Sequence, residues 1–335
     1  MTQSEGSSPA ADSVHRARGG ARPSFARRAL IWAFRIGGTA AGFAYIASIV
    51  DMDELGTAFG RVGIGAFAAA CAMMSLGLVV ASLRWRIMLS AYGAEAPPPF
   101  LTLVRAYWIG LFYNSFLPGG LGGDIVRGVV TRKAFGERGA TASLTVVFVE
   151  RALGLTGLLL LVSGTALVRP LPGTEGLLPL CMGGLAASIA AIALLAIGYR
   201  LPKERLGRLG KIVGSLPKIE RPLSFALALV LSLGTQVISA LVGWILLDAV
   251  HPAGVRVFDA FVIVPLAMAT AFLPFTVGGA GAREATLVTL CAAALGMNEA
   301  NALAASLLIF GAQLAVALPG GPLQLLSPRE PSPAR

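Results

Sequence analysis

Long apolar runs separated by short polar stretches make up most of the chain. Each run is close to the ~20 residues that a helix needs to cross a bilayer. The six runs cover residues 29–50, 62–83, 140–168, 176–199, 223–250 and 300–319. The pattern therefore predicts an all-α, polytopic membrane protein with about six full transmembrane helices.

Two further apolar segments, about 99–138 and 258–297, are broken near their centres by Pro and Gly. If the first segment crossed the bilayer alone, the Lys and Arg residues after the break would face outside, against the positive-inside rule. A re-entrant hairpin keeps them inside, and non-helical backbone is tolerated at membrane depth where protein or a water-filled cavity covers it. We therefore predict two broken re-entrant helical hairpins. Two ordinary spans of unequal length are the alternative.

The two breaks repeat one another. Phe116-Leu117-Pro118 and Phe272-Leu273-Pro274 are each followed by a Gly-Gly pair, and an arginine follows each proline after nine residues. The halves 29–168 and 176–319 both have the order span, span, hairpin, span. Three full spans per half would invert the second half, so the hairpins would enter from opposite faces and meet near the midplane. Inverted repeats of this kind are typical of transporters.

Composition supports the membrane assignment, because 56% of the residues are hydrophobic and only 13% are charged. The formal net charge of +10 is explained by Lys and Arg that flank spans, above all in 200–222, so no nucleic-acid partner is expected. Their distribution predicts a multi-pass protein of the cell inner membrane with both termini cytoplasmic. We expect residues 1–28 to be a disordered cytoplasmic tail and 321–335 a flexible C-terminal tail, on either side of a membrane domain at 29–320.

The sequence contains no motif for metal binding or for ATP hydrolysis. The three cysteines, Cys71, Cys181 and Cys291, lie singly in apolar runs, and no His, Cys or carboxylate spacing suggests a metal site. A Walker-type Gly-Lys-Ser/Thr loop is absent from the sequence, which argues against direct ATP hydrolysis. We expect no metal and no cofactor.

The candidate substrate-binding residues lie at the two breaks and in the middle of the 140–168 span. Backbone N–H groups at the start of a returning helix favour anions, and glycines allow a ligand to approach the backbone closely. Arginine provides a planar, permanently charged fork for phosphate. The candidates are Asn114, Pro118, Gly119, Gly120, Gly122, Gly123, Asp124, Arg127, Glu150, Arg151, Pro274, Gly278, Gly279, Arg283 and Glu284.

Some of these residues have simpler interpretations. Asp124 is also placed to be a helix N-cap, and Arg127 to be an interfacial positive-inside residue. Asn114 either holds the carbonyls freed by the break or donates to a headgroup. The adjacent Glu150 and Arg151 are costly at membrane depth unless each faces a partner or a cavity. Elsewhere in the spans, polar residues such as Gln236 are expected to form interhelical hydrogen bonds.

Three motifs, taken in order, resemble the flippase-like membrane domain of lysylphosphatidylglycerol synthases. They are NSFLPGGLGGDIVR from Asn114, VER from Val149, and LPFTVGGAGARE from Leu273. The resemblance covers about 29–320 and implies a protein that moves, or helps to move, a lipid of the phospholipid, polyprenyl-phosphate or hopanoid type. The chain ends at Arg335, so we do not expect the synthases' soluble aminoacyl-transferase domain or lysine transfer from charged tRNA.

The sequence thus favours a lipid translocase over two other classes of protein. A polar, phosphate-bearing headgroup would occupy a cavity between the hairpins, compensated by Arg127, Arg151 and Arg283, since burying an uncompensated charge in hydrocarbon is prohibitive. One alternative is an intramembrane enzyme on a lipid-linked phosphate or sugar that uses Asp124, Glu150 or Glu284 as acid or base. The other is a non-catalytic membrane assembly factor.

Overall fold

The structure, a computed structural model, describes residues 44, 48, 51–116, 122–173, 175–197, 218–270 and 281–325. Every regular element in these ranges is a helix, which confirms the all-α prediction. The elements are α3 (Met52–Arg61), α4 (Ile64–Ala91), α5 (Phe100–Phe116), α6 (Gly122–Thr131), η1 (Arg132–Arg138), α7 (Gly139–Val168), α8 (Leu177–Ile197), α10 (Pro222–Val250), α11 (Val257–Ala269), α12 (Ala282–Leu295), α13 (Glu299–Ala317) and α14 (Gly320–Leu325).

Four helical stretches of the described chain are long and apolar enough to cross a bilayer, so the protein is a polytopic membrane protein. Three lie in α4, α7 and α10, and the fourth runs from α13 through α14. Two shorter apolar stretches are Leu177–Ala193, which is part of α8, and α11. The run predicted at 29–50 lies almost wholly outside the described residues, so the count of six full spans stays a prediction.

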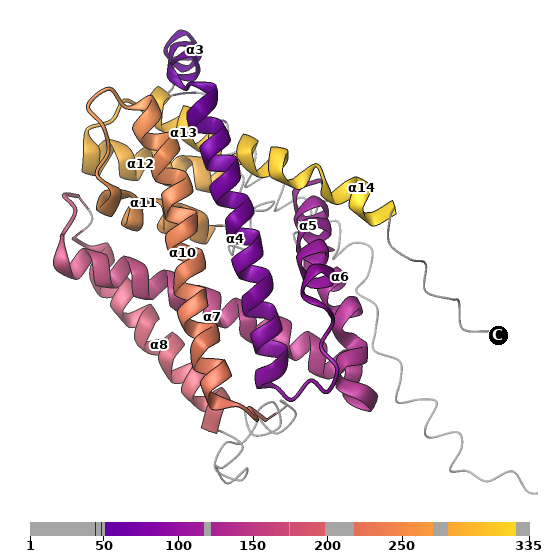
Figure 1. The fold of residues 1–335 in the computed structure, drawn as a ribbon. Helices are drawn as coiled ribbons and strands as arrows, with labels where there is room; N and C mark the ends of the chain where they lie inside the picture. The colour runs from indigo at the N-terminus through magenta and orange to yellow at the C-terminus, as the bar shows by residue number, and fades with distance from the viewer. Residues whose placement is uncertain are drawn as a thin grey trace, which may run out of the picture.

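The antiparallel pair α4 and α10 forms the centre of the molecule (Figure 1). At one end, Ala91 O of α4 accepts from Glu220 N just before α10, at 2.8 Å. Glycines allow close helix packing along this centre. A Cβ at Gly157 of α7 would lie 2.9 Å from the Ser232 backbone of α10, so no side chain fits at this crossing. Helix α7 therefore approaches α10 closely, and the two helices cross in Figure 1.

The first broken segment forms a helical hairpin of α5 and α6. These helices have 17 and 10 residues, short of the ~20 needed to cross a bilayer. They run antiparallel, since Gly123 at the start of α6 lies against Gly110 and Asn114, while Arg127 further along reaches back to Tyr107. After α6 the chain returns to its point of entry, where Glu95 N donates to Ala134 O at 3.0 Å. These features agree with the predicted re-entrant hairpin, although the position of the membrane stays a prediction.

The second broken segment consists of α11 and α12, which contact one another, and its break at 271–280 lies outside the described residues. Its two ends lie near the other end of the α4–α10 pair. Trp244 Nε1 near the end of α10 donates to Val255 O just before α11, at 2.7 Å. After α12, Asn298 Nδ2 donates to Glu54 of α3 at 2.7 Å. The two segments thus enter and leave at opposite ends of the α4–α10 pair, while the repeat relation between the halves stays a prediction.

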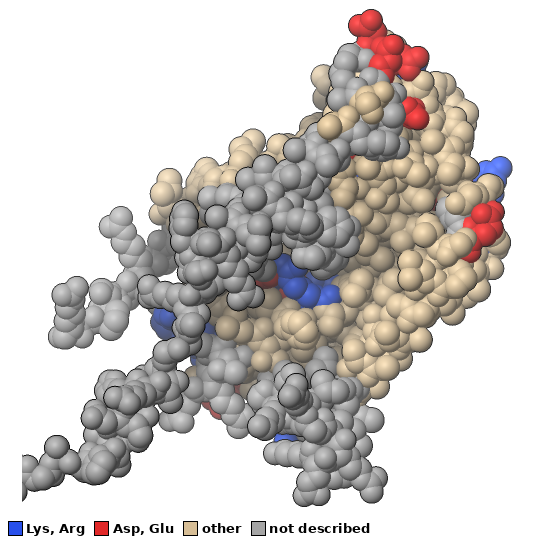
Figure 2. All heavy atoms as spheres, turned by 180° about the vertical axis from the view of Figure 1, so that it is seen from behind, with Lys and Arg blue, Asp and Glu red and all other residues tan. Residues whose placement is uncertain are grey.

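The two ends of the molecule differ in charge. We call the end at which α4 finishes the basic end, and the end at which α3 lies the acidic end. Acidic atoms are visible around α3 in Figure 2, whereas most of the coloured atoms between the ends belong to uncharged residues. Near the basic end, the basic residues Arg86, Arg132, Lys133, Lys218 and Arg221 outnumber the acidic Glu95 and Glu220. Near the acidic end, the acidic residues Asp51, Asp53, Glu54, Asp259 and Glu299 outnumber the basic Arg61, Arg169 and Arg256.

After a turn at 318–319, the chain continues as the short helix α14 to Leu325. Helix α14 packs on α5, where a Cβ at Gly320 would collide with Trp108 O. Arg105 Nε also donates to Leu323 O at 3.0 Å. Residues 326–335 lie outside the described residues.

Candidate functional site: a buried charge cluster beside a cavity

Five charged side chains from three helices meet in the interior, and Tyr107 of α5 joins them. We call this set the charge cluster: Arg84 of α4, Asp124 and Arg127 of α6, and Glu150 and Arg151 of α7. Four of the five had been predicted as site residues from the sequence. The structure brings those four together and adds Arg84 and Tyr107.

Glu150 is the centre of the cluster and is only 3% exposed. Its Oε2 accepts from Arg127 Nη1 at 2.5 Å. Its Oε1 accepts from the Tyr107 hydroxyl at 2.5 Å and forms an ion pair with Arg84. A carboxylate buried at this depth is tolerated because all of these donors are charged or strongly polar.

Arg127 links the two carboxylates. Besides Glu150, it forms an ion pair with Asp124 and donates from Nη1 to the Tyr107 hydroxyl at 2.7 Å. Its guanidinium also lies over aromatic rings, 5.2 Å from the Trp85 centroid and 4.7 Å from that of Tyr107. At 9% exposure it is a buried member of a network rather than an interfacial residue. The positive-inside interpretation of Arg127 is therefore wrong.

Arg151 is the most exposed arginine of the cluster. Its Nε donates to Asp124 Oδ2 at 2.7 Å, yet 39% of its side chain remains exposed. Helix α6 begins at Gly122, so Asp124 lies inside its first turn and the N-cap interpretation is wrong. The carboxylate of Asp124 instead pairs with Arg127 and Arg151. Three arginines and two carboxylates leave the cluster with a formal charge of 3 − 2 = +1.

A cavity of ≈ 380 Å³ lies beside the charge cluster. One wall carries Arg84, Tyr107, Arg127, Glu150 and Arg151, and α10 contributes Thr235, Gln236 and Ser239. Gln236 Nε2 donates to Gly154 O of α7 at 3.0 Å, which confirms the expected interhelical hydrogen bond. The cavity thus pairs a positively charged wall with an uncharged, hydrogen-bonding one.

Asn114 and Gly123 also line the cavity. Asn114 Oδ1 accepts from Gly123 N at 2.8 Å, so the amide fixes the start of the returning helix α6. The bond differs from the first role predicted for Asn114, which was to hold freed carbonyls, because here the side chain accepts from an N–H. The second predicted role, donation to a headgroup, stays a prediction. Of the remaining candidates in the first break, Gly122 begins α6, while Pro118, Gly119 and Gly120 lie outside the described residues.

The charged residues of the second hairpin form a separate buried pair. Arg283 Nε donates to Glu284 Oε1 at 3.0 Å, and its guanidinium lies 5.0 Å from the Phe310 ring centroid. Glu284 Oε2 accepts from Gly281 N at 2.7 Å, which caps α12. Neither residue is among the described lining of the cavity, so these contacts do not support a common cavity for Arg127 and Arg283. Pro274, Gly278 and Gly279 lie outside the described residues.

Sequence reasoning missed Arg84 because it ended the span at residue 83. The apolar pattern continues through Trp85, Met88 and Leu89, all fully buried, and α4 runs on to Ala91. Arg84 is consequently inside a helix, where its Nη1 also donates to Ser232 Oγ at 3.1 Å. Tyr107 carried no signal beyond its place in an apolar segment. Among the described residues, no cluster of His, Cys and carboxylates fit for a metal was found.

The helical bundle, its hydrophobic surface and the buried charged cavity define a polytopic α-helical membrane protein with a polar internal site. The chain belongs to the family of the lysylphosphatidylglycerol synthase TM region, whose sequence profile matches residues 30–321. Membership confirms the resemblance and connects the chain to membrane-lipid-related function. A search of curated proteins found no match.

Proposed function

We propose that this protein is a lipid translocase that carries a phosphate-bearing headgroup through the cavity beside the charge cluster, while the lipid's chains stay in the bilayer. The observation that carries the proposal is the buried cluster of formal charge +1 on the wall of a ≈ 380 Å³ cavity. A headgroup loses its hydration as it leaves the interface, and fixed donors inside the protein replace that hydration.

Arg151 is the residue best suited to contact the headgroup. It is the least buried arginine of the cluster and lines the cavity, while Asp124 holds it from one side. Arg84 offers a further donor, because its buried Nε has no hydrogen-bond partner among the described residues. The planar guanidinium groups match two phosphate oxygens at once. Glu150 and Asp124 keep the arginines compensated when no anion is bound.

The charge difference between the ends supports an orientation for the protein. By the positive-inside rule the basic end faces the cytoplasm, so the acidic end faces the opposite side of the cell inner membrane. Glu95→Cys at the basic end and Asp53→Cys at the acidic end test this. A membrane-impermeant maleimide should label only the second variant in intact cells, after the three native cysteines have been replaced. Labelling of Glu95→Cys from outside would reverse the orientation.

The test of transport is reconstitution into liposomes that contain a headgroup-labelled phosphatidylglycerol. Arg151→Gln should slow lipid movement by about tenfold or more, since one charge-assisted hydrogen-bonding partner of the phosphate is lost. The matched control is Arg86→Gln, because Arg86 is an exposed arginine of α4 two residues from Arg84. Its lipid movement should equal that of the wild type.

The same experiment separates the competing functions. If Arg151→Gln moves lipid as fast as the wild type, the cluster does not bind the headgroup and the assembly-factor hypothesis gains support. A lipid that is recovered chemically altered after incubation with purified protein would instead indicate the intramembrane enzyme. We expect the lipid to be recovered unchanged on the other leaflet.

A further inference from the structure

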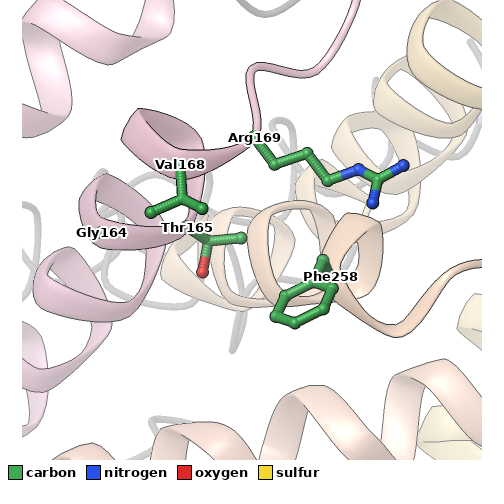
Figure 3. Close-up of a pocket in the computed structure, with 5 residues that line it drawn as sticks. All are labelled: Gly164, Thr165, Val168, Arg169 and Phe258. Atoms are coloured by element: carbon green, nitrogen blue, oxygen red, sulfur yellow. The ribbon is translucent and has the colours of Figure 1, made fainter.

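A second, more apolar cavity lies at the acidic end, between the end of α7 and the start of α11. It has a volume of ≈ 330 Å³ and is lined by Gly164, Thr165, Val168, Arg169 and Phe258. Figure 3 shows the first four residues on α7 and the turn that follows it, with Phe258 opposite on α11. We call this cavity the end groove. Neither the sequence motifs nor the family assignment concerns it.

The shape and surroundings of the end groove suit a hydrocarbon chain. A Cβ added at Gly164 would meet no atom within 4 Å, so the missing side chain leaves space along the helix. Val168 is 88% exposed and Phe258 51%, and Leu167 beside them is exposed too. Because α7 is a membrane-spanning candidate, the molecules that bathe these apolar side chains are the lipids of the leaflet at the acidic end.

Arg169 gives the end groove a polar mouth. It follows directly after Val168, the last residue of α7, where a spanning helix reaches the membrane interface. Its Nε lies 3.9 Å from Asp259 Oδ1, an ion-pair contact that is too long for a hydrogen bond. The side chain is 40% exposed, and in Figure 3 it extends past Phe258. Its donors are therefore accessible to an acceptor at the interface.

We propose that the end groove binds one glycerophospholipid of this leaflet, with an acyl chain over Gly164 and against Phe258 and its phosphate on Arg169. The site differs from the cavity of the charge cluster. Arg151 and Arg169 are 18 residues apart on one helical segment, which is about 27 Å at 1.5 Å per residue. This proposal does not depend on lipid translocation, since it concerns equilibrium binding of a bilayer lipid.

Photocrosslinking tests the proposal with a phosphatidylglycerol that carries a diazirine in one acyl chain, titrated onto the detergent-purified full-length protein. We expect saturable labelling of peptides that contain 164–169 and 257–261. Gly164→Leu should raise the half-saturating probe concentration by about tenfold, because it fills the space for the chain. The matched control is Gly183→Leu on α8, another exposed helical glycine whose Cβ would meet nothing within 4 Å.

A second probe examines the mouth of the end groove. Arg169→Gln should weaken labelling by the phosphatidylglycerol probe, again by about tenfold. It should leave labelling by a diacylglycerol with the same diazirine chain unchanged, because that molecule has no phosphate. Labelling spread evenly over all lipid-facing helices, or unaltered by Gly164→Leu, would show only ordinary bilayer contact and overturn the proposal. So would an equal effect of Arg169→Gln on both probes.

Discussion

Replacement of Glu150 by Gln should destabilise the protein strongly, since this carboxylate compensates two buried arginines. It accepts from Arg84, Arg127 and Tyr107, with Arg127 Nη1 and the Tyr107 hydroxyl both at 2.5 Å. Gln has nearly the same shape, so packing is retained. Its amide carries only one acceptor oxygen, and its NH₂ group would face guanidinium donors. The formal charge of the cluster would rise from +1 to +2.

The size of the effect follows from the contacts. Three hydrogen bonds to a charged group are worth about 1.5–3 kcal/mol each, but the desolvation of the ions offsets part of this. Removing one partner of a buried ion pair costs about 3–5 kcal/mol, because the remaining charge is left uncompensated. We therefore expect the free energy of unfolding to fall by about 3–5 kcal/mol, a large share of the stability of any domain.

The assay is unfolding by sodium dodecyl sulfate in mixed micelles, followed by tryptophan fluorescence. Trp85 is fully buried and lies against Arg127, so its emission reports on the cluster. The matched control is Glu95→Gln, which removes an exposed carboxylate outside the cluster and should change the free energy of unfolding by less than about 0.5 kcal/mol.

A double-mutant cycle with Arg84→Met tests the reasoning further. The double variant has the wild-type cluster charge of +1, and Ser232 keeps its hydrogen bond to Ala228 O. The loss in the free energy of unfolding should therefore be about 1–3 kcal/mol smaller in the double variant than the sum of the losses in the two single variants. A strictly additive cycle, or a Glu150→Gln variant as stable as the wild type, would refute the view that Glu150 compensates Arg84.

Three further predictions concern close contacts of the fold. Gly157→Ala should lower the free energy of unfolding by about 1–3 kcal/mol in the same assay, because the added Cβ would meet the α10 backbone. The control Gly164→Ala should leave the free energy of unfolding unchanged, because its Cβ would lie in open space. Asn114→Ala removes the acceptor of the Gly123 N–H at the start of α6, so hydrogen exchange of the α6 amides should become faster. Unchanged exchange would contradict this role of Asn114. Gly320→Val should detach α14 from Trp108, because the larger side chain would collide with the Trp108 carbonyl oxygen. Limited proteolysis should then cleave the variant just before α14, at a site that is protected in the wild type.

Much of the fold could be predicted from local sequence. The apolar runs gave the positions of α4, α7, α10 and α13, because a span is a property of consecutive residues and of the bilayer thickness. The Pro and Gly residues predicted the break between α5 and α6, because both residue types interrupt a helix locally. The end of α4 was predicted eight residues early, since Arg84 and Arg86 were taken as the start of a loop. From sequence alone, a buried arginine cannot be distinguished from an arginine at the membrane interface, because its ion-pair partner is not known.

The candidate site was predictable only in part. Asp124, Arg127, Glu150 and Arg151 stood out because ionisable residues are costly in an apolar setting. The prediction for Arg283 rested on an alignment of two similar stretches, and the described contacts instead pair it with Glu284 and Phe310. Similar local sequences predict similar local structure, but they do not determine which helices lie beside them.

The sequence by itself determined that the chain is a polytopic membrane protein with broken helices and a few costly charges, since these properties depend on composition and order alone. The tertiary structure decided which charges meet. Glu150 lies 66 residues from Arg84 and 43 from Tyr107, and it pairs with both only because α4, α5 and α7 converge. Electrostatic compensation acts over a few ångströms in space, so no distance along the sequence reveals it.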